Sequence, residues 1–137
     1  MIGGGTLLGL SNLMTGIKDF DKIIEMAQKG NNANVDMLVK DIYGDKSPIS
    51  ELAGDILASS FAKIASDHST QSEDMHEKYK HEDVLNSLVT MISINIGQLA
   101  YYQAQLHQAK TIYFVGSYVR ENPLGRKLMD FAVNFSG

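Results

Sequence analysis

Apolar residues recur at steps of three and four along much of the chain, a spacing that predicts helices rather than strands. The first predicted helix covers residues 5–15 and is followed by Gly16. The second covers residues 20–29, with Asp19 placed to cap its beginning and Gly30 following its end. Glycine after a periodic stretch is typical of a helix end, because it enters the left-handed conformation without a steric penalty.

Two further helices are predicted before the middle of the chain. One covers residues 35–43 with Asn34 as its cap, and the other covers residues 51–67, where apolar positions form one stripe. A turn-rich break at 44–48 separates them. Residues 66–83 are polar and acidic and hold few large apolar groups, so they are expected to form a surface loop or insertion.

The longest periodic segment, residues 84–109, contains no Asp, Glu, Lys or Arg. As a helix it would extend about 39 Å. It carries too many uncharged polar side chains for a hydrocarbon environment, so we expect protein rather than membrane to cover it. Apolar side chains also lie off its main stripe, which favours a homodimer in which a second copy covers this face. Those side chains are Met91, Ile94, Tyr101 and Tyr102.

Only residues 111–115, T-I-Y-F-V, have the continuous β-branched and aromatic character of a buried strand, and Gly116 follows them. A last helix is predicted over residues 122–135, with proline in its first turn. A strand buried on both faces needs neighbours, and the glycine run Gly3–Gly5 has no strand before it. We therefore expect this polypeptide to be a piece of a larger α/β domain.

The composition changes the picture mainly by exclusion. With 137 residues, 44% of them hydrophobic and 20% charged, the chain has the size and composition of one globular domain. The net charge of −4 disfavours a nucleic-acid partner. The chain has no cysteine, which excludes disulfides and agrees with a reducing compartment. No run of 18 apolar residues and no secretion signal is visible, so a cytoplasmic protein without a membrane span is expected.

Two short glycine motifs carry candidate chemistry. I-G-G-G-T at residues 2–6 opens a helix, and its backbone N–H groups suit an anion such as a nucleotide phosphate. A flexible start with a glycine cap explains the same residues, and no G-K-[ST] follows. V-G-S-Y-V-R at residues 115–120 lets a flat ring approach the backbone at its glycine, or forms an ordinary turn. For each motif, the residues alone do not decide between a nucleotide-binding role and an ordinary structural role.

The side chains assign no catalytic residue and no metal site. Acidic residues fall mainly at helix caps and on exposed faces, and no Ser/His/Asp set can be assembled from spacing. The histidines show no metal-ligand spacing, and three of them lie in the polar segment. They are His68, His76, His81 and His107.

Four stretches taken together resemble the type II, or eukaryotic-type, pantothenate kinases. They are I-G-G-G-T-L-L-G-L near the start, N-V-D-M-L-V-K-D-I-Y-G at 34–44, A-S-S-F at 58–61 and I-Y-F-V-G-S-Y-V-R at 112–120. The likeness runs in order along nearly the whole chain, and residues 66–83 match least. The family belongs to the acetate and sugar kinase, Hsp70 and actin superfamily. The resemblance therefore implies an α/β fold: part of the C-terminal lobe of an actin-like, ribonuclease H-like ATPase, locally helix-dominated.

What the resemblance implies for function is ATP-dependent phosphorylation of pantothenate to 4'-phosphopantothenate, the first step of coenzyme A biosynthesis, with Mg²⁺ and with acyl-CoA as an inhibitor. Residues matching the family's nucleotide-binding stretches are Gly3, Gly4, Gly5, Thr6, Gly116 and Ser117. Residues matching its pantothenate and acyl-CoA pocket are Tyr43, Ala132 and Phe135. Ser136 stands where many members have tryptophan, and the uncharged helix matches the family's dimer helix.

The chain also lacks parts of the family's pattern. The D-x-G-G-T phosphate loop, the catalytic glutamate, the G-S-G hairpin and the final strand and helix are not found in it. Phosphoryl transfer needs residues on both sides of the γ-phosphate, and this chain supplies only one side, so the isolated chain is expected to be inactive. ATP and Mg²⁺ are expected to be bound mainly by a lobe that the chain lacks. Two alternatives stay open: an inactive homologue acting as a dimeric nucleotide or acyl-CoA binding module, and a helical interaction module that shares only ancestry.

Overall fold

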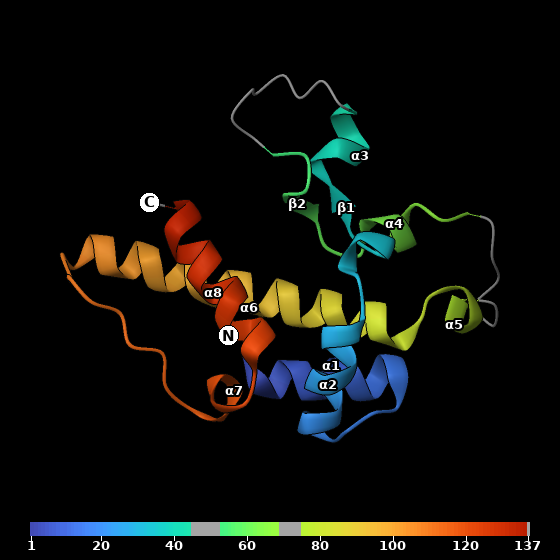
Figure 1. Ribbon diagram of the computed structural model, residues 1–137, viewed down its shortest axis with the longest axis horizontal. Coiled ribbons are helices and arrows are strands. Elements are labelled where there is room, and N and C mark those ends of the chain that lie inside the picture. Colours follow the sequence, from blue (N-terminus) through green and yellow to red (C-terminus); the bar gives the residue numbers. More distant parts are fainter. Residues whose placement is uncertain (45–52, 69–74, 137) are drawn as a thin grey trace.

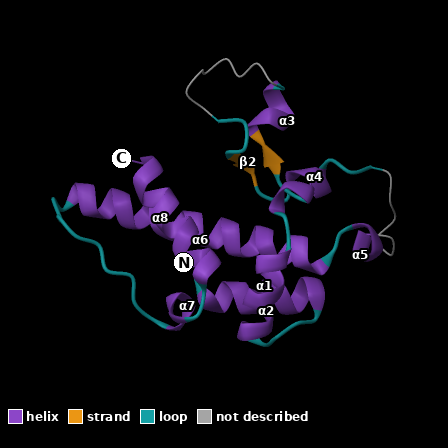
Figure 2. Ribbon diagram, in the orientation of Figure 1, coloured by secondary structure: helices purple, strands orange, loops and turns teal. Residues whose placement is uncertain are grey.

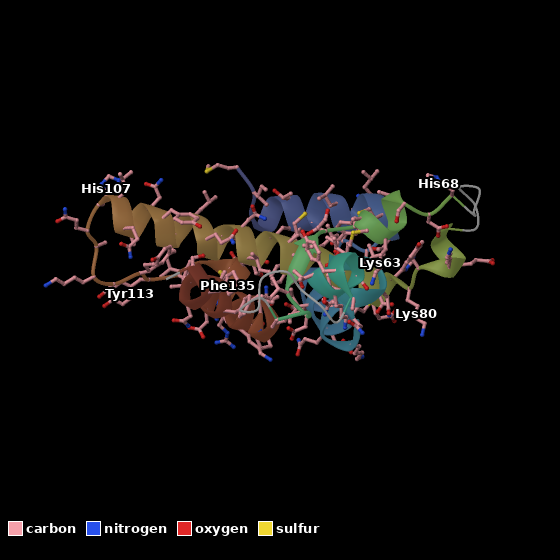
Figure 3. All side chains as sticks on the ribbon, turned by 90° about the horizontal axis from the view of Figure 1, so that it is seen from above. Lys63, His68, Lys80, His107, Tyr113 and Phe135 are labelled. Carbon is pink, nitrogen blue, oxygen red and sulfur yellow. The ribbon has the colours of Figure 1, made fainter. Side chains whose placement is uncertain are left out.

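One long helix, α6 (His81–Leu106), forms the axis of the molecule (Figure 1). The computed structural model describes residues 1–44, 53–68 and 75–136. Helices α1 (Gly4–Thr15) and α2 (Phe20–Lys29) lie along one side of α6, and α8 (Pro123–Ser136) crosses it near its C-terminal half. Seen from above, the molecule is elongated, with His107 and Tyr113 at one end and His68 and Lys80 at the other (Figure 3).

The first two helices confirm the predictions from local sequence. Asp19 Oδ1 accepts a hydrogen bond from the Lys22 backbone N–H at 2.8 Å, which is the expected N-cap of α2. Gly16 ends α1 in the left-handed conformation, with φ at 74°, and its N–H donates to the Asn12 carbonyl. The hydrophobic core lies where these helices meet α6. Its buried residues are Leu7, Ile23, Ile24, Ala27, Leu85, Leu88, Val89 and Ile92.

Gly30 ends α2 for a different reason from the one predicted. Its φ is −83°, a value open to any residue. A side chain at this position would meet the start of α6, because an added Cβ would lie 2.0 Å from the Glu82 carbonyl oxygen. The side-chain amide of Asn86 on α6 also links the two helices, because it donates to the Ala27 and Gly30 carbonyls at 2.7 and 3.1 Å. Close packing between two helices therefore requires this glycine.

The helices predicted at 35–43 and 51–67 are largely wrong. A short 3-10 turn (Asn32–Asn34) leads into strand β1 (Met37–Leu38), and only α3 (Val39–Tyr43) is helical in the first segment. In the second segment the structure has strand β2 (Leu57–Ser59) and the one-turn helix α4 (Ala62–Ala65), while residues 51 and 52 lie outside the described part. β1 and β2 pair antiparallel, as a small sheet beside the helices (Figure 2).

Buried hydrogen bonds explain why the first of these helices does not form. Asp36 is fully buried, and its carboxyl group accepts from the Asn32 amide, the Phe61 backbone N–H and the Ser87 hydroxyl. These partners lie on three separate segments. The backbone at Asp36 must therefore take a non-helical conformation for the carboxyl group to reach all three. Asn31, not Asn34, caps the short turn by accepting from the Ala33 N–H at 3.0 Å.

The polar segment 66–83 is not simply a loop. It contains the short helix α5 (Met75–Lys78) and the first residues of α6, whereas residues 69–74 lie outside the described part. Asp83 is buried and accepts from the Asn31 backbone N–H and the Asn34 side-chain amide, at 2.7 and 2.8 Å. An acidic residue assigned to a surface loop thus fixes the chain after α2 against α6.

The predicted uncharged helix is present as α6, shifted three residues toward the N-terminus. By length and composition it is the one helix in the described ranges that could cross a membrane, and more than half of its most apolar window is buried inside the protein. The core helix of a soluble protein meets the same criteria. Its C-terminal half differs from its N-terminal half, since Leu99, Tyr102 and Leu106 are exposed along one face.

The strand predicted at 111–115 is wrong in this structure. These residues are extended but form no sheet, because the described residues offer no strand beside them, and Tyr113 and Val115 are 84% and 87% exposed. A short helix, α7 (Ser117–Arg120), follows. The last helix is confirmed as α8, and the Asn122 side chain caps it by accepting from the Gly125 N–H at 2.7 Å.

The observed fold is therefore mixed α/β and mostly helical, with one two-stranded sheet in the described part. The predicted α/β class, dominated by helices, is confirmed. The assignment to an actin-like lobe stays a prediction.

Candidate functional site

The two glycine motifs, more than 100 residues apart in sequence, meet in space. A Cβ added to Gly4, in the first turn of α1, would lie 3.7 Å from Cδ2 of the Tyr118 ring. Tyr118 lies directly after Ser117 in α7, so the N-terminus of α1 and the Gly116–Ser117 turn belong to one region of the surface. Spacing along the sequence gave no sign of this contact.

Tyr118 fixes the second motif against three helices. Its hydroxyl lies 2.8 Å from Ser93 Oγ and donates weakly to the Val89 carbonyl at 3.4 Å, both on α6. Its ring meets Phe20 of α2 edge to face, with 6.4 Å between centroids. Burial raises the pKa of the Tyr118 hydroxyl, and hydrogen bonding with the Ser93 and Asn122 side chains opposes part of that rise. The turn is thus anchored to the helical core.

The first motif keeps its backbone open. Gly3 and Gly5 have nothing within 4 Å of an added Cβ, so side chains leave this turn open except on the Tyr118 side of Gly4. The first α1 hydrogen bond runs from the Leu7 N–H to the Gly3 carbonyl, so the N–H groups of the preceding turn have no intrahelical acceptor. Thr6 Oγ1 accepts from the Gly3 N–H at 3.2 Å, which shapes the start of the helix. Backbone donors of this kind are suited to an anion.

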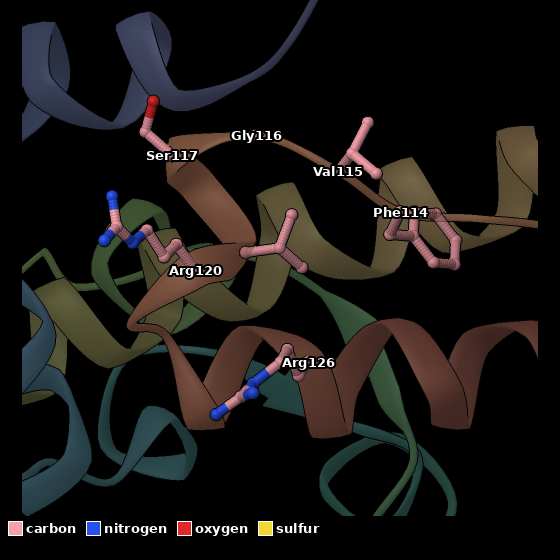
Figure 4. Close-up of a pocket in the computed structure, with 7 residues that line it drawn as sticks. Phe114, Val115, Gly116, Ser117, Arg120 and Arg126 are labelled. Carbon is pink, nitrogen blue, oxygen red and sulfur yellow. The ribbon is translucent and has the colours of Figure 1, made fainter.

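A cavity of about 560 Å³ opens beside the second motif (Figure 4). Gly116 has φ at 115°, a value that only glycine adopts readily, and this turn gives the cavity its backbone wall. The cavity is lined by Phe114, Val115, Gly116, Ser117, Val119, Arg120 and Arg126. Two arginines and no carboxylate face it, so the lining favours a negatively charged ligand.

The family is shown by comparison with known proteins. The family model described as Fumble matches residues 1–137. The chain belongs to the Fumble family. Pantothenate kinase 1 of Arabidopsis thaliana is 45% identical over 136 residues, which are 98% of this chain and 34% of that protein. The eukaryotic-type pantothenate kinase family that the sequence resembles is thereby confirmed.

Other relatives of this Fumble chain have different names and greater lengths. Pantothenate kinase 2 of Oryza sativa subsp. japonica is 44% identical over 98% of the chain, which covers 14% of that protein. A Mus musculus protein named 4'-phosphopantetheine phosphatase is 41% identical over 98% of the chain, which covers 15% of it. The chain therefore spans 14% to 34% of the length of these three relatives.

The structure separates the residues matched to the pantothenate and acyl-CoA pocket. Tyr43 is half exposed at the end of α3. Ala132 is buried where α8 crosses α6 beside Gly97. Phe135 stacks on Phe131 and lines a second cavity of about 560 Å³ between α8, α6 and residues 53–57, which neither Tyr43 nor Ala132 lines. The assignment of these three residues to one pocket stays a prediction.

Sequence reasoning named neither arginine as a site residue, although Arg120 ends V-G-S-Y-V-R, and it missed the role of Tyr118. A signal for the arginines was present, since Arg120 and Arg126 are the only arginines among the 12 basic residues of the chain. Tyr118 was visible only as part of V-G-S-Y-V-R, and its contacts with Gly4, Phe20 and Ser93 come from the packing of separate helices.

Proposed function

We propose that this Fumble chain is part of the C-terminal lobe of an ATP-dependent pantothenate kinase, acting in the cytoplasm. The reaction transfers the γ-phosphoryl group of ATP to the terminal hydroxyl of pantothenate, giving 4'-phosphopantothenate and ADP, and Mg²⁺, when bound, would neutralise charge on the phosphates. The names of the plant relatives support this reaction. Because the chain spans at most 34% of the three relatives compared above, the activity is proposed for the full-length protein that contains it.

The observation that carries the proposal is the contact between the two glycine motifs. Gly4 and Tyr118 bring the open N-terminus of α1 next to the turn at Gly116. A nucleotide requires both backbone donors for its phosphates and a glycine-lined surface for its flat base. Phosphoryl transfer depends on positioning and on charge stabilisation, and these two motifs supply the positioning on one side of the nucleotide.

We place the catalytic base outside this chain. The cavity at Gly116 is lined by no aspartate or glutamate, and the described residues hold no group of three His, Cys, Asp or Glu that could bind a metal ion. In the full-length kinase, other residues would supply the carboxylate that accepts the pantothenate proton and most ligands of the Mg²⁺. The chain alone is therefore expected to bind part of the nucleotide without transferring its phosphoryl group.

A homodimer through α6 is part of the proposal. Leu99, Tyr102 and Leu106 lie three and four residues apart on the exposed half of this helix. Three large apolar side chains on one helical face are typical of a helix that packs against another protein surface. A second copy of the chain is the occupant that we propose.

An inactive homologue that binds nucleotide or acyl-CoA remains the second candidate. The relative that favours it is the mouse protein named 4'-phosphopantetheine phosphatase, whose identity to this chain is close to that of the plant kinases. The identity to the mouse protein, 41%, and the identities to the plant kinases, 44% and 45%, differ too little to decide between the two candidate functions. Ser136, at the end of α8, stands where the resemblance implies a tryptophan in many members, which weighs against the acyl-CoA part of this candidate.

Steady-state kinetics of the full-length protein with two matched glycine variants tests the proposal. Gly4→Val places a branched side chain beside Tyr118 at the proposed phosphate-binding turn. Gly9→Val makes the same change on α1 where an added Cβ has nothing within 4 Å. The KM for ATP should rise at least tenfold in the first variant and change less than twofold in the second. Equal KM values in both variants and the wild type would remove α1 from the nucleotide site.

A further inference from the structure

The two arginines of the chain line one cavity, although they belong to different helices. Arg120 ends α7 and Arg126 lies in the first turns of α8. Both line the cavity beside Gly116, and no lysine of residues 1–44, 53–68 and 75–136 does. An arginine guanidinium presents several N–H donors in one plane and binds phosphate oxygens in pairs, which a lysine cannot do.

No acidic side chain in the described part of the molecule forms an ion pair with either arginine. Glu121 follows Arg120 and lines no part of the cavity, whereas Asp130, one turn after Arg126, lines an adjoining cavity that shares Phe114, Val119 and Arg126. Neither carboxylate comes within 4.0 Å of a guanidinium nitrogen to form an ion pair. The ion pairs found among the described residues all use lysine. A ligand would therefore have no ion pair to displace at either arginine.

Apart from Ser117, the remaining side chains of the lining are apolar and include one aromatic ring. Figure 4 shows Phe114 at one end of the cavity and the two guanidinium groups toward the other. Val115 and Val119 complete the apolar wall, and Gly116 leaves the backbone between the two ends uncovered. A ligand that fits has a flat or apolar part at one end and a phosphate group at the other.

We propose that Arg120 and Arg126 bind a phosphate group of a nucleotide whose base lies toward Phe114. This inference rests on the proposed function, because it names the residues of that nucleotide site that hold negative charge. It goes further by assigning phosphate contacts to two side chains, Arg120 at the end of V-G-S-Y-V-R and Arg126 on α8, in addition to the backbone donors of α1.

Isothermal titration calorimetry of the full-length protein tests the assignment with ATP and adenosine as probes. Arg120→Gln and Arg126→Gln should each weaken ATP binding about tenfold or more and change adenosine binding less than twofold, since only ATP carries phosphate. Phe114→Ala should weaken both probes by a similar factor. Arg126→Lys keeps the charge but loses the paired donors, so it should weaken ATP binding less than Arg126→Gln.

Lys127→Gln is the matched control, since Lys127 is an exposed cation next to Arg126 that does not line the cavity. It should leave both affinities within twofold of the wild type. Unchanged ATP affinity in both arginine-to-glutamine variants, or an equal loss in the lysine control, overturns the inference. Thermal unfolding of each variant shows whether it is folded, and both arginines are exposed, so their loss leaves no buried charge.

The outcomes separate this inference from the proposed function. If the full-length protein phosphorylates pantothenate while both arginine variants bind ATP normally, the kinase proposal stands and the arginine assignment is wrong. If it forms no 4'-phosphopantothenate but binds ATP in an arginine-dependent way, the kinase proposal is wrong and the assignment stands.

Discussion

The hydroxyl oxygen of Tyr118 lies 2.8 Å from Oγ of Ser93, and this hydrogen bond joins α7 to the middle of α6. Ser93 is fully buried, so its hydroxyl has no water to bond instead. The same tyrosine ring lies beside Gly4 at the start of α1, where an added Cβ would be 3.7 Å from Cδ2. One side chain thus links the helical core to both glycine motifs of the proposed nucleotide site.

Tyr118 should make the stability of the chain depend on alkaline pH. Burial raises its pKa above the ordinary value of 10.0, because the buried hydroxyl ionises less readily. Below pH 10 its contribution to the free energy of unfolding is fully present. Above pH 10 the unfolded chain releases this proton first, so the contribution is lost as the pH rises through the folded-state pKa.

Urea unfolding of the wild type and Tyr118→Phe between pH 8 and pH 11 measures this difference. As the pH rises above 10, the free energy of unfolding of the wild type should fall relative to that of the phenylalanine variant. A gap that stays constant over the whole range would show that the hydroxyl is not shielded from water.

Gly97 should be intolerant of larger residues, because it forms the crossing point of α6 and α8. A Cβ added there would lie 2.7 Å from Cβ of Ala132 and 2.8 Å from the Met129 carbonyl oxygen. Gly97→Val should therefore force the helices apart and cost about 2 kcal/mol of unfolding free energy. Gly9→Ala, in open space on α1, should stabilise the chain by about 0.5 kcal/mol or more. Equal effects in a urea titration would contradict the packing described.

Asp36→Ala should be among the most damaging polar substitutions. It removes the acceptor for three donors on separate segments, namely Asn32, Phe61 and Ser87. The expected loss is about 3 kcal/mol, compared with about 1 kcal/mol for Ser87→Ala, which removes a single donor. Chemical denaturation of the two variants gives both numbers, and a smaller loss for Asp36→Ala than for Ser87→Ala would refute the arrangement.

Leu99→Asp should break the proposed dimer without unfolding the chain. Leu99 is 61% exposed in the single chain, so a charge there costs about 0.5 kcal/mol or less in the monomer. In a dimer through α6 the same charge would be buried without a partner. Sedimentation velocity should show a dimer for the wild type and a monomer for the variant. A dimer in both would place the contact elsewhere.

Sequence reasoning located the elements whose signals are local. Asp19 and Gly16 act within one turn of their own helices, so α1 and α2 were predicted correctly. It failed where the deciding contact is distant in sequence. The carboxyl group of Asp36 is held by residues up to 51 positions away, and this overrides the helical spacing of residues 35–38.

The same distinction applies to the candidate site. The glycine motifs were recognisable because only glycine suits their turns and because they resemble a known family. Their proximity through Tyr118, and the shared cavity of Arg120 and Arg126, depend on how α1, α7 and α8 pack around α6. The segment 111–115 shows the converse, since a strand-like sequence forms a strand only when another strand lies beside it.

The most direct measurement is mass spectrometry of pantothenate incubated with Mg²⁺ and ATP, with the full-length protein that contains this segment in one sample and the 137-residue chain in another. Our account predicts ATP-dependent 4'-phosphopantothenate from the full-length protein and none from the chain alone. No product from the folded full-length protein, or product from the chain by itself, would contradict it.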